Sequence, residues 1–212
     1  MVAAWFTVLL IGVLIASVVY FAVMGLVQRG RTRRLARTAH EMNMHFSADD
    51  PFDVPRRYAG FALLAAGHSL RASNVTYGRL DGTPVRAFDF RHELGHGTRR
   101  ITEHYGVIVA ETDVPVRPVL MWHERDAEAA PLAARDSQRR IGCWRLVGDE
   151  AFGSFLSEAC GPLAADDASI QTYGTAVMVC VPIRRRQQEY ANRLGDVLAI
   201  VRRIGSSAGG GG

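Results

Sequence analysis

Five consecutive residues, His92-Glu93-Leu94-Gly95-His96, match the pattern H-E-x-x-H that binds zinc in metalloproteases. The pattern works on a helix, because a spacing of four residues places both imidazoles on one face. The glutamate beside the first histidine then acts as general base toward the metal-bound water. Zinc chemistry at this position therefore requires a helix over residues 90–98 and a third ligand elsewhere in the chain.

The residues around the pattern indicate a strand that ends in a loop. The preceding segment, 83–91, alternates polar with apolar or aromatic residues and follows an Asp-Gly pair typical of a type I′ hairpin turn. Two glycines flank the second histidine, and each costs about 1 kcal/mol in a helix relative to Ala. In a strand, four residues span about 13 Å, too far for His92 and His96 to share one zinc. We expect no cofactor; a zinc metalloprotease with Glu93 as base is the alternative.

The N-terminal residues 1–28 are predicted to form a transmembrane helix. Residues 2–27 carry no charged side chain, and as a helix they would be about 39 Å long, enough to cross a hydrocarbon core of about 30 Å. Positive charge follows at once, with Arg29, Arg31, Arg33 and Arg34. Because positive flanks stay in the cytoplasm, we expect an outside N-terminus and a cytoplasmic domain at a bacterial inner membrane.

The arginines also suggest an alternative in which the domain contacts anionic lipids. All 25 basic residues are arginine, and a second cluster precedes the last predicted helix, at Arg184, Arg185 and Arg186. The net charge of +4 is modest, and we expect no nucleic-acid partner. The three cysteines are widely spaced and odd in number, which favours free thiols in a reducing compartment.

The remainder of the chain is predicted to be an α+β domain. Residues 29–51 are expected to form a juxtamembrane helix and a linker, 52–204 the domain, and 205–212 a flexible Gly/Ser tail. Period-two segments predict strands and period-3.6 segments predict helices. The expected strands are 73–80, 83–94, 98–112, 114–125, 139–148, 168–174 and 175–183, and the expected helices are 31–43, 149–163 and 186–203.

This order predicts a largely antiparallel, curved sheet with the two late helices on one face, the C-terminal helix among them. A pleckstrin-homology-like barrel closed by that helix is the alternative. Asp149 is expected to cap the first late helix, and Gly174 to lie near the turn of the second hairpin. Pro115 and Pro118 cannot donate to a ladder, so their strand should lie at an edge or begin late.

The first hairpin carries a distinctive set of residues: Gly67, Asn74, Val75, Gly78, Gly82, Phe88, Asp89, Phe90, Gly95 and Gly97. With these residues the chain resembles, over 52–204, a family of uncharacterised bacterial proteins anchored in the membrane by one span. The resemblance implies that residues 92–97 end a strand and begin a loop, and it brings no activity. The chain departs from the family at His92 and Glu93, and that departure creates H-E-x-x-H.

Within the hairpin, we expect Gly78 to lie at a bulge or where another backbone approaches. Asn74 is expected to hydrogen-bond a neighbouring loop. Asp89 should point away from the flanking phenylalanines and pair with Arg86 or Arg100 across the sheet. We therefore expect a non-enzymatic interaction or scaffold domain, anchored in the membrane and acting with a protein partner.

Overall fold

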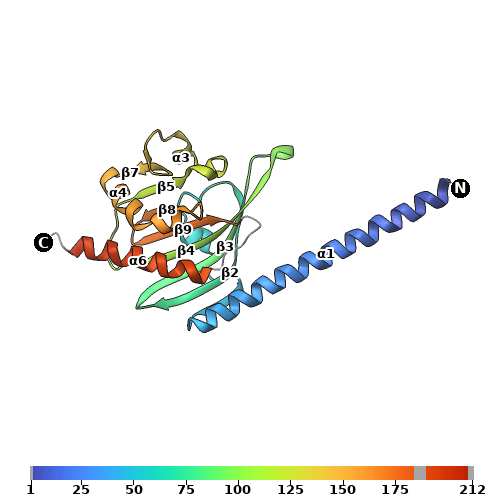
Figure 1. Ribbon diagram of the computed structural model, residues 1–212, viewed down its shortest axis with the longest axis horizontal. Coiled ribbons are helices and arrows are strands. Elements are labelled where there is room, and N and C mark those ends of the chain that lie inside the picture. The colour runs from blue at the N-terminus through green and yellow to red at the C-terminus, as the bar shows by residue number, and fades with distance from the viewer. Residues whose placement is uncertain (1, 184–189, 210–212) are drawn as a thin grey trace.

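The computed structural model describes residues 2–183 and 190–209 (Figure 1). In this part of the chain, nine strands form one antiparallel sheet in the spatial order β1-β2-β3-β4-β9-β8-β5-β7-β6. The strands are β1 (His45–Asp49), β2 (His68–Leu80), β3 (Thr83–Leu94), β4 (Ile101–Glu111), β5 (Val119–His123), β6 (Arg140–Ile141), β7 (Trp144–Gly148), β8 (Ser169–Tyr173) and β9 (Ala176–Pro182). The helices are α1 (Val2–Glu41), α2 (Val54–Arg57), α3 (Leu132–Asp136), α4 (Glu150–Ala159), α5 (Gly161–Ala164) and α6 (Tyr190–Gly209), with 3-10 turns η1 (Gly97–Arg99) and η2 (Glu124–Ala129).

Helix α1 contacts the domain only near its C-terminal end and otherwise projects away from it (Figure 1). Leu35 and Ala39 are buried against the sheet. Between residues 9 and 23, the large apolar side chains are exposed, as at Leu14 (64%) and Val18 (62%). Over the residues that the structure describes, no helix is long and apolar enough to cross a membrane.

The β2–β3 hairpin turns at Asp81-Gly82, as predicted. Both residues have a positive φ, 49° and 84°, which is the requirement of a type I′ turn. Leu80 pairs with Thr83 directly beyond the turn. β4 then returns along β3 in an unbroken register from Val85 to Leu94, so β2, β3 and β4 form a long three-stranded unit.

The second half of the chain completes the sheet. β5 begins only after Pro115 and Pro118 and lies between β8 and β7, so the prediction of a late start is confirmed. Asp149 caps α4 by accepting a hydrogen bond from the Phe152 amide at 2.7 Å. The turn between β8 and β9 contains Gly174 with a φ of 61°.

Both faces of the sheet carry a hydrophobic core. One face packs against the end of α1, α4, α5 and α6, with Leu156, Val197 and Ile204 among the buried residues. The opposite face packs against the segment between β1 and β2 and against η2 and α3, and it buries Phe61 and Trp122. The expected α+β class, antiparallel sheet and shared face for the two late helices are confirmed, and the sheet has open edges at β1 and β6 rather than closing into a barrel.

Two boundaries differ from the sequence prediction. The stretch 29–51, expected to hold a helix and a linker, also contains strand β1, which pairs with β2 at the sheet edge. The tail expected to be flexible from residue 205 is helical as far as Gly209.

Candidate functional site

Asp89 on β3 joins the sheet to α1 through a two-point ion pair. The Nε of Arg31 donates to Oδ2 at 3.0 Å, and its second guanidinium nitrogen donates to Oδ1 at 2.5 Å. Both side chains are largely buried, with 16% and 15% exposure. A bidentate arginine–carboxylate pair fixes orientation as well as distance, so this contact helps to set the direction in which α1 leaves the domain.

Asn74 completes the network from the neighbouring strand. Its side-chain amide donates to Oδ2 of Asp89 at 2.8 Å, and its amide oxygen accepts from the Thr32 hydroxyl at 3.1 Å. Asn74 lies in a β-bulge of β2, where the register shifts between Ser73 and Thr76, and its φ is 52°. Asparagine tolerates this left-handed conformation better than most residues, which suits it to the bulge.

The partners of Asp89 differ from those expected from the sequence. Arg86 lies an odd number of residues away and points to the other face, where it pairs with Glu111 at 2.5 Å. Arg100, which follows the end of β3, pairs with Glu93 at 3.1 Å. Asn74 contacts α1 and β3 rather than a loop.

Gly78 pairs in regular register with Val85; the register shifts of β2 lie between His68 and Arg71 and between Ser73 and Thr76, and not at Gly78. A Cβ on Gly78 would lie 3.3 Å from the Cγ and 3.5 Å from the Cα of Met44. The close approach of another chain segment therefore accounts for this glycine. Gly82 lies in the turn between β2 and β3, where a Cβ would meet no other atom within 4 Å. Its positive φ therefore explains why a glycine occupies this position.

A cavity of about 390 Å³ lies beside the Arg31–Asp89 contact. Two arginines of adjacent strands line it, since Arg71 on β2 is directly opposite Arg91 on β3. His104 on β4, which is opposite Arg91, also lies in the lining. The Nε of Arg91 is buried and has no hydrogen-bond partner in the described chain. Sequence reasoning missed Arg71 and Arg91, since their pairing depends on the bulge.

The arginines expected at the membrane surface fall into two groups. Arg29, Arg33 and Arg34 are exposed on α1, whereas Arg31 turns toward Asp89. The second cluster, Arg184, Arg185 and Arg186, lies outside the described residues.

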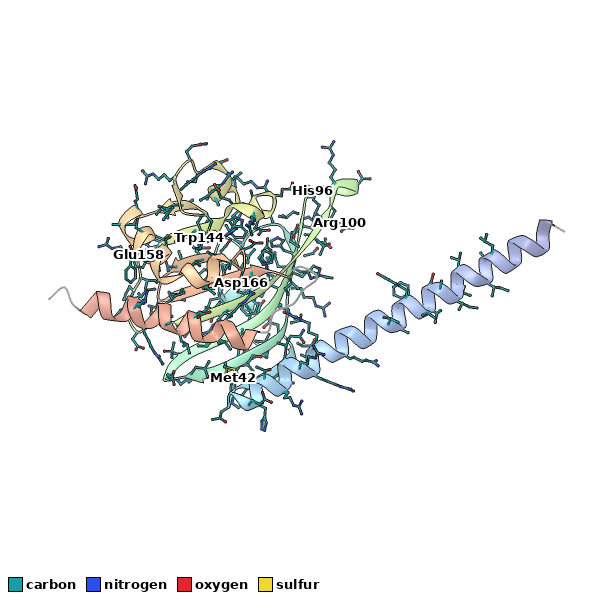
Figure 2. All side chains as sticks on the ribbon, in the orientation of Figure 1. Met42, His96, Arg100, Trp144, Glu158 and Asp166 are labelled. Carbon is teal, nitrogen blue, oxygen red and sulfur yellow. The ribbon has the colours of Figure 1, made fainter. Side chains whose placement is uncertain are left out.

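The H-E-x-x-H residues lie on a strand and a loop, as the glycines and the alternating pattern predicted. His92 is fully buried and packs against the rings of Phe90 and Tyr105, with centroid distances of 5.5 and 5.8 Å. His96 lies past the end of β3, near the exposed tip of the β3–β4 connection, and stacks on His68 at 5.2 Å (Figure 2). No group of three metal-ligating side chains is present among the described residues.

Glu93 takes part in surface ion pairs rather than facing the two histidines. It lies 3.1 Å from Arg100 and 3.7 Å from the His68 Nε2. Hydrogen bonding to Ser69 and the charges of Arg100 and His68 hold the pKa of Glu93 below its usual value. The carboxylate thus stays ionised, which a general base needs, but its contacts are with Arg100 and the His68 ring at the rim of the sheet.

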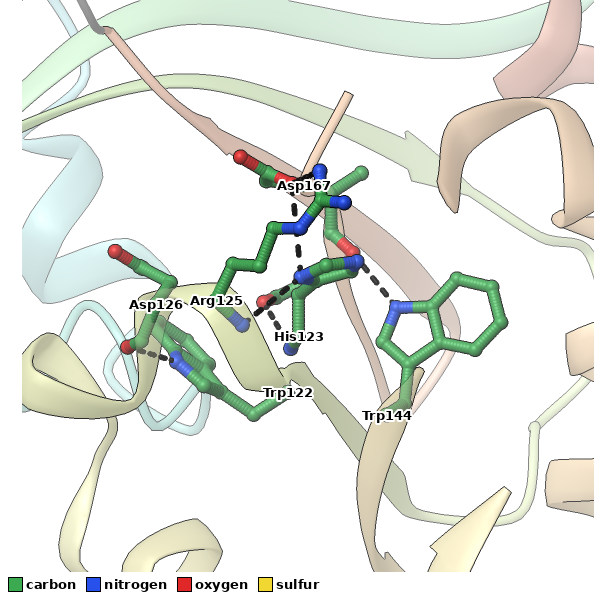
Figure 3. A network of polar contacts seen from close by, with 8 residues as sticks. Trp122, His123, Arg125, Asp126, Trp144 and Asp167 are labelled. Carbon is green, nitrogen blue, oxygen red and sulfur yellow. Dashed lines mark hydrogen bonds and ion pairs between the residues drawn. The ribbon is translucent and has the colours of Figure 1, made fainter. Parts of the chain in front are cut away.

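A second polar cluster surrounds His123 at the end of β5 (Figure 3). The His123 Nδ1 lies 3.8 Å from Oδ1 of Asp167, and the same oxygen lies 3.3 Å from the Arg125 guanidinium. Trp144 donates its indole N–H to the Ala168 carbonyl at 2.7 Å, and Trp122 donates to the Asp126 carbonyl at 2.9 Å.

The cluster brings together Ser169, His123 and Asp167, the residue types of a hydrolase triad, but its hydrogen bonds run differently. The His123 Nδ1 accepts from the Arg125 amide at 3.2 Å, so it cannot donate to Asp167 as a triad histidine does. Ser169 accepts from the His123 backbone amide at 2.8 Å rather than contacting the ring. This cluster ties β5, η2 and β8 together, and the neighbouring Cys143 has its pKa raised by burial, so its thiol is not activated.

No protein-family model matches the chain, and no curated protein matches it. The fold is similar to the crystal structure of the mycobacterial trehalose monomycolate transport factor A, TtfA, with a TM-score of 0.53 and 14% sequence identity. The match covers 84% of this chain and 94% of that chain. At this identity the likeness concerns the fold, and it extends over most of both molecules.

Proposed function

We propose that the protein is a membrane-anchored, non-enzymatic interaction domain that α1 holds in a set orientation at the cytoplasmic face of a bacterial inner membrane. The observation that carries this proposal is the continuity of α1. One uninterrupted helix joins an exposed apolar segment to a C-terminal end that packs on the sheet. At that end Leu35 and Ala39 are buried, and Arg31 forms an ion pair with Asp89. A helix built in this way transmits the orientation of its anchor to the domain.

The sequence supports the membrane part of the proposal. Residues 2–27 carry no charged side chain, and exposed arginines begin at Arg29. Exposed apolar side chains on a helix that projects from a domain are costly in water. Burying a leucine or valine side chain contributes about 1.5–3 kcal/mol of free energy, which a fully exposed side chain does not gain. Lipid would bury them, and the positive flank favours the cytoplasm for the domain.

The likeness to a transport factor supports an accessory role. TtfA is described as a factor for trehalose monomycolate transport, and its fold is shared over most of the present chain. In the present chain, the residue types that suggested zinc or triad chemistry are engaged in packing and structural hydrogen bonds. We infer a domain that acts by binding a protein partner at the membrane, and not by catalysis.

The anchor is tested on the full chain with two arginines placed in the apolar segment. The double variant Leu14→Arg/Val18→Arg adds about 5–7 kcal/mol to the cost of insertion, at about 2.5–3.5 kcal/mol for each arginine. We expect the unaltered chain to stay in the membrane pellet during alkaline carbonate extraction and the variant to move to the supernatant. The matched control Arg33→Leu/Arg34→Leu, outside the segment, should stay in the pellet.

Orientation and partner contact are tested in the same cells. A C-terminal fluorescent-protein fusion, which fluoresces only in the cytoplasm, should be bright, and a C-terminal alkaline phosphatase fusion should be inactive. A photo-crosslinker at an exposed position of the domain should give a discrete protein adduct that disappears in the Leu14→Arg/Val18→Arg variant. A periplasmic domain, or a soluble unaltered chain, would contradict the proposal.

A further inference from the structure

We propose that the cavity between the end of α1 and strands β2, β3 and β4 binds a phosphate ester, either the headgroup of an anionic lipid or a soluble phosphate compound. The binding groups are Arg71 and Arg91, supported by His104 and Ser73. The lipid source rests on the proposed membrane anchor, whereas the phosphate chemistry does not.

The charges in the cavity favour an anion as the ligand. Arg71 and Arg91 are directly opposite each other in an antiparallel pair, an arrangement that is destabilising for like charges. Neither makes a side-chain hydrogen bond or ion pair with the described residues; Arg71 is exposed, whereas Arg91 is partly buried and its Nε is buried without a partner. The carboxylate in the lining, Asp89, is already held by Arg31 and Asn74.

The donors suit phosphate in particular. Two guanidinium groups on adjacent strands present planar pairs of N–H donors, the geometry that binds phosphate oxygens bidentately. The Ser73 hydroxyl also lies in the cavity lining and adds a neutral hydrogen-bonding group. The cavity volume is about 390 Å³. A water molecule occupies about 30 Å³ in the liquid, so the cavity is larger than ten waters and has room for a phosphate and its ester group.

The position of the cavity along α1 matches the headgroup layer of a bilayer. Arg31 and Thr32 follow the last residue of the uncharged stretch by four and five positions, or about 6–8 Å along the helix axis. A headgroup layer is about 5–8 Å thick on each side of the hydrocarbon core. With α1 inserted as proposed, the cavity lies at the depth of the lipid phosphates in a leaflet that is anionic.

The proposal is tested on the full chain by removing the two unpaired charges. The variant Arg71→Gln/Arg91→Gln is compared with Arg99→Gln/Arg139→Gln, which removes the same charge from two exposed arginines outside the cavity. In the lipid arm, each protein is purified from nanodiscs of equal phosphatidylglycerol and phosphatidylcholine, and retained lipid is counted by native mass spectrometry. In the soluble arm, glycerol 3-phosphate is titrated in detergent while the melting temperature is recorded.

We expect the unaltered chain to retain phosphatidylglycerol at least tenfold over phosphatidylcholine, the cavity variant to lose this preference, and the control to keep it within twofold. The cavity variant should also melt at a higher temperature than the unaltered chain without phosphate, because the repulsion between Arg71 and Arg91 is gone. If the two arginines only stabilise the fold, the cavity variant should instead melt at a lower temperature than the unaltered chain.

The two arms separate the sources and the underlying proposals. Stabilisation by glycerol 3-phosphate that needs Arg71 and Arg91, without lipid preference, assigns the cavity to a soluble phosphate compound. That result would stand even if carbonate extraction removed the chain from membranes. The proposal would be overturned if the cavity variant and the control retained lipid equally and responded equally to glycerol 3-phosphate. It would also be overturned if neither arm gave a response.

Discussion

The contact between α1 and the sheet leads to a quantitative prediction for Asp89→Asn. The substitution keeps the shape of the side chain and removes the charge that Arg31 binds. Removing one partner of a fully buried pair costs about 3–5 kcal/mol. Here the two side chains keep 16% and 15% exposure, so water screens part of the loss and we expect about 2–3 kcal/mol. For a chain of this length that lowers the melting temperature by about 5–10 °C.

The assay is thermal unfolding of the full chain in mild detergent, followed by circular dichroism. The control is Glu41→Gln, which breaks the ion pair between Arg37 and Glu41 on the same helix. That pair is 3.8 Å long, with 82% and 65% exposure, so the control should shift the melting temperature by less than about 2 °C.

A double-mutant cycle with Arg31→Gln isolates the pair itself. We expect a coupling energy of about 1–3 kcal/mol between Arg31 and Asp89, and faster amide exchange over the docked end of α1 in each single variant. Additive effects of the two substitutions, or a shift for Asp89→Asn no larger than that of the control, would refute the argument that this contact holds α1.

Three further predictions concern the buried histidine, the metal and the glycines. Burial lowers the pKa of His92 below its ordinary value of 6.5. As the pH drops, the unfolded chain therefore takes up a proton before the folded chain does, and stability falls below about pH 6.5. Between pH 7.5 and 5.5, His92→Phe should lose less melting temperature than the unaltered chain. Elemental mass spectrometry of the full chain, purified without chelator, should find far less than one zinc per chain and no change in His96→Ala; one zinc that the substitution removes would overturn the strand assignment. In α6, a Cβ on Gly195 would meet no atom within 4 Å, so Gly195→Ala should stabilise the fold by about 0.5–1 kcal/mol in urea unfolding. A Cβ on Gly67 would lie 2.4 Å from a backbone oxygen, and the φ of Gly67 is 74°. Gly67→Ala should therefore destabilise the fold by about 2 kcal/mol or more.

The elements that sequence reasoning located correctly are those determined by local chemistry. Asp81 and Gly82 supply the two positive φ values of a tight turn, and Asp149 supplies the oxygen that caps α4. The apolar stripe of α6 repeats at helical spacing over several turns. Strand β1 escaped prediction because five residues at a sheet edge owe their structure to pairing with β2, which no local pattern encodes.

The candidate site escaped prediction for a sharper reason, a shift of one residue in strand register. The turn pairs Leu80 with Thr83, and the same register carried along the hairpin would place Arg71 opposite the buried His92. The bulge at Asn74 shifts the register, so Arg71 pairs with Arg91 instead, on the face that α1 reaches. Asn74 thus both makes the bulge and, through Asp89 and Thr32, ties it to α1. One residue therefore sets the pairing that forms the cationic cavity and holds the helix beside it, which is why neither feature could be inferred without the other.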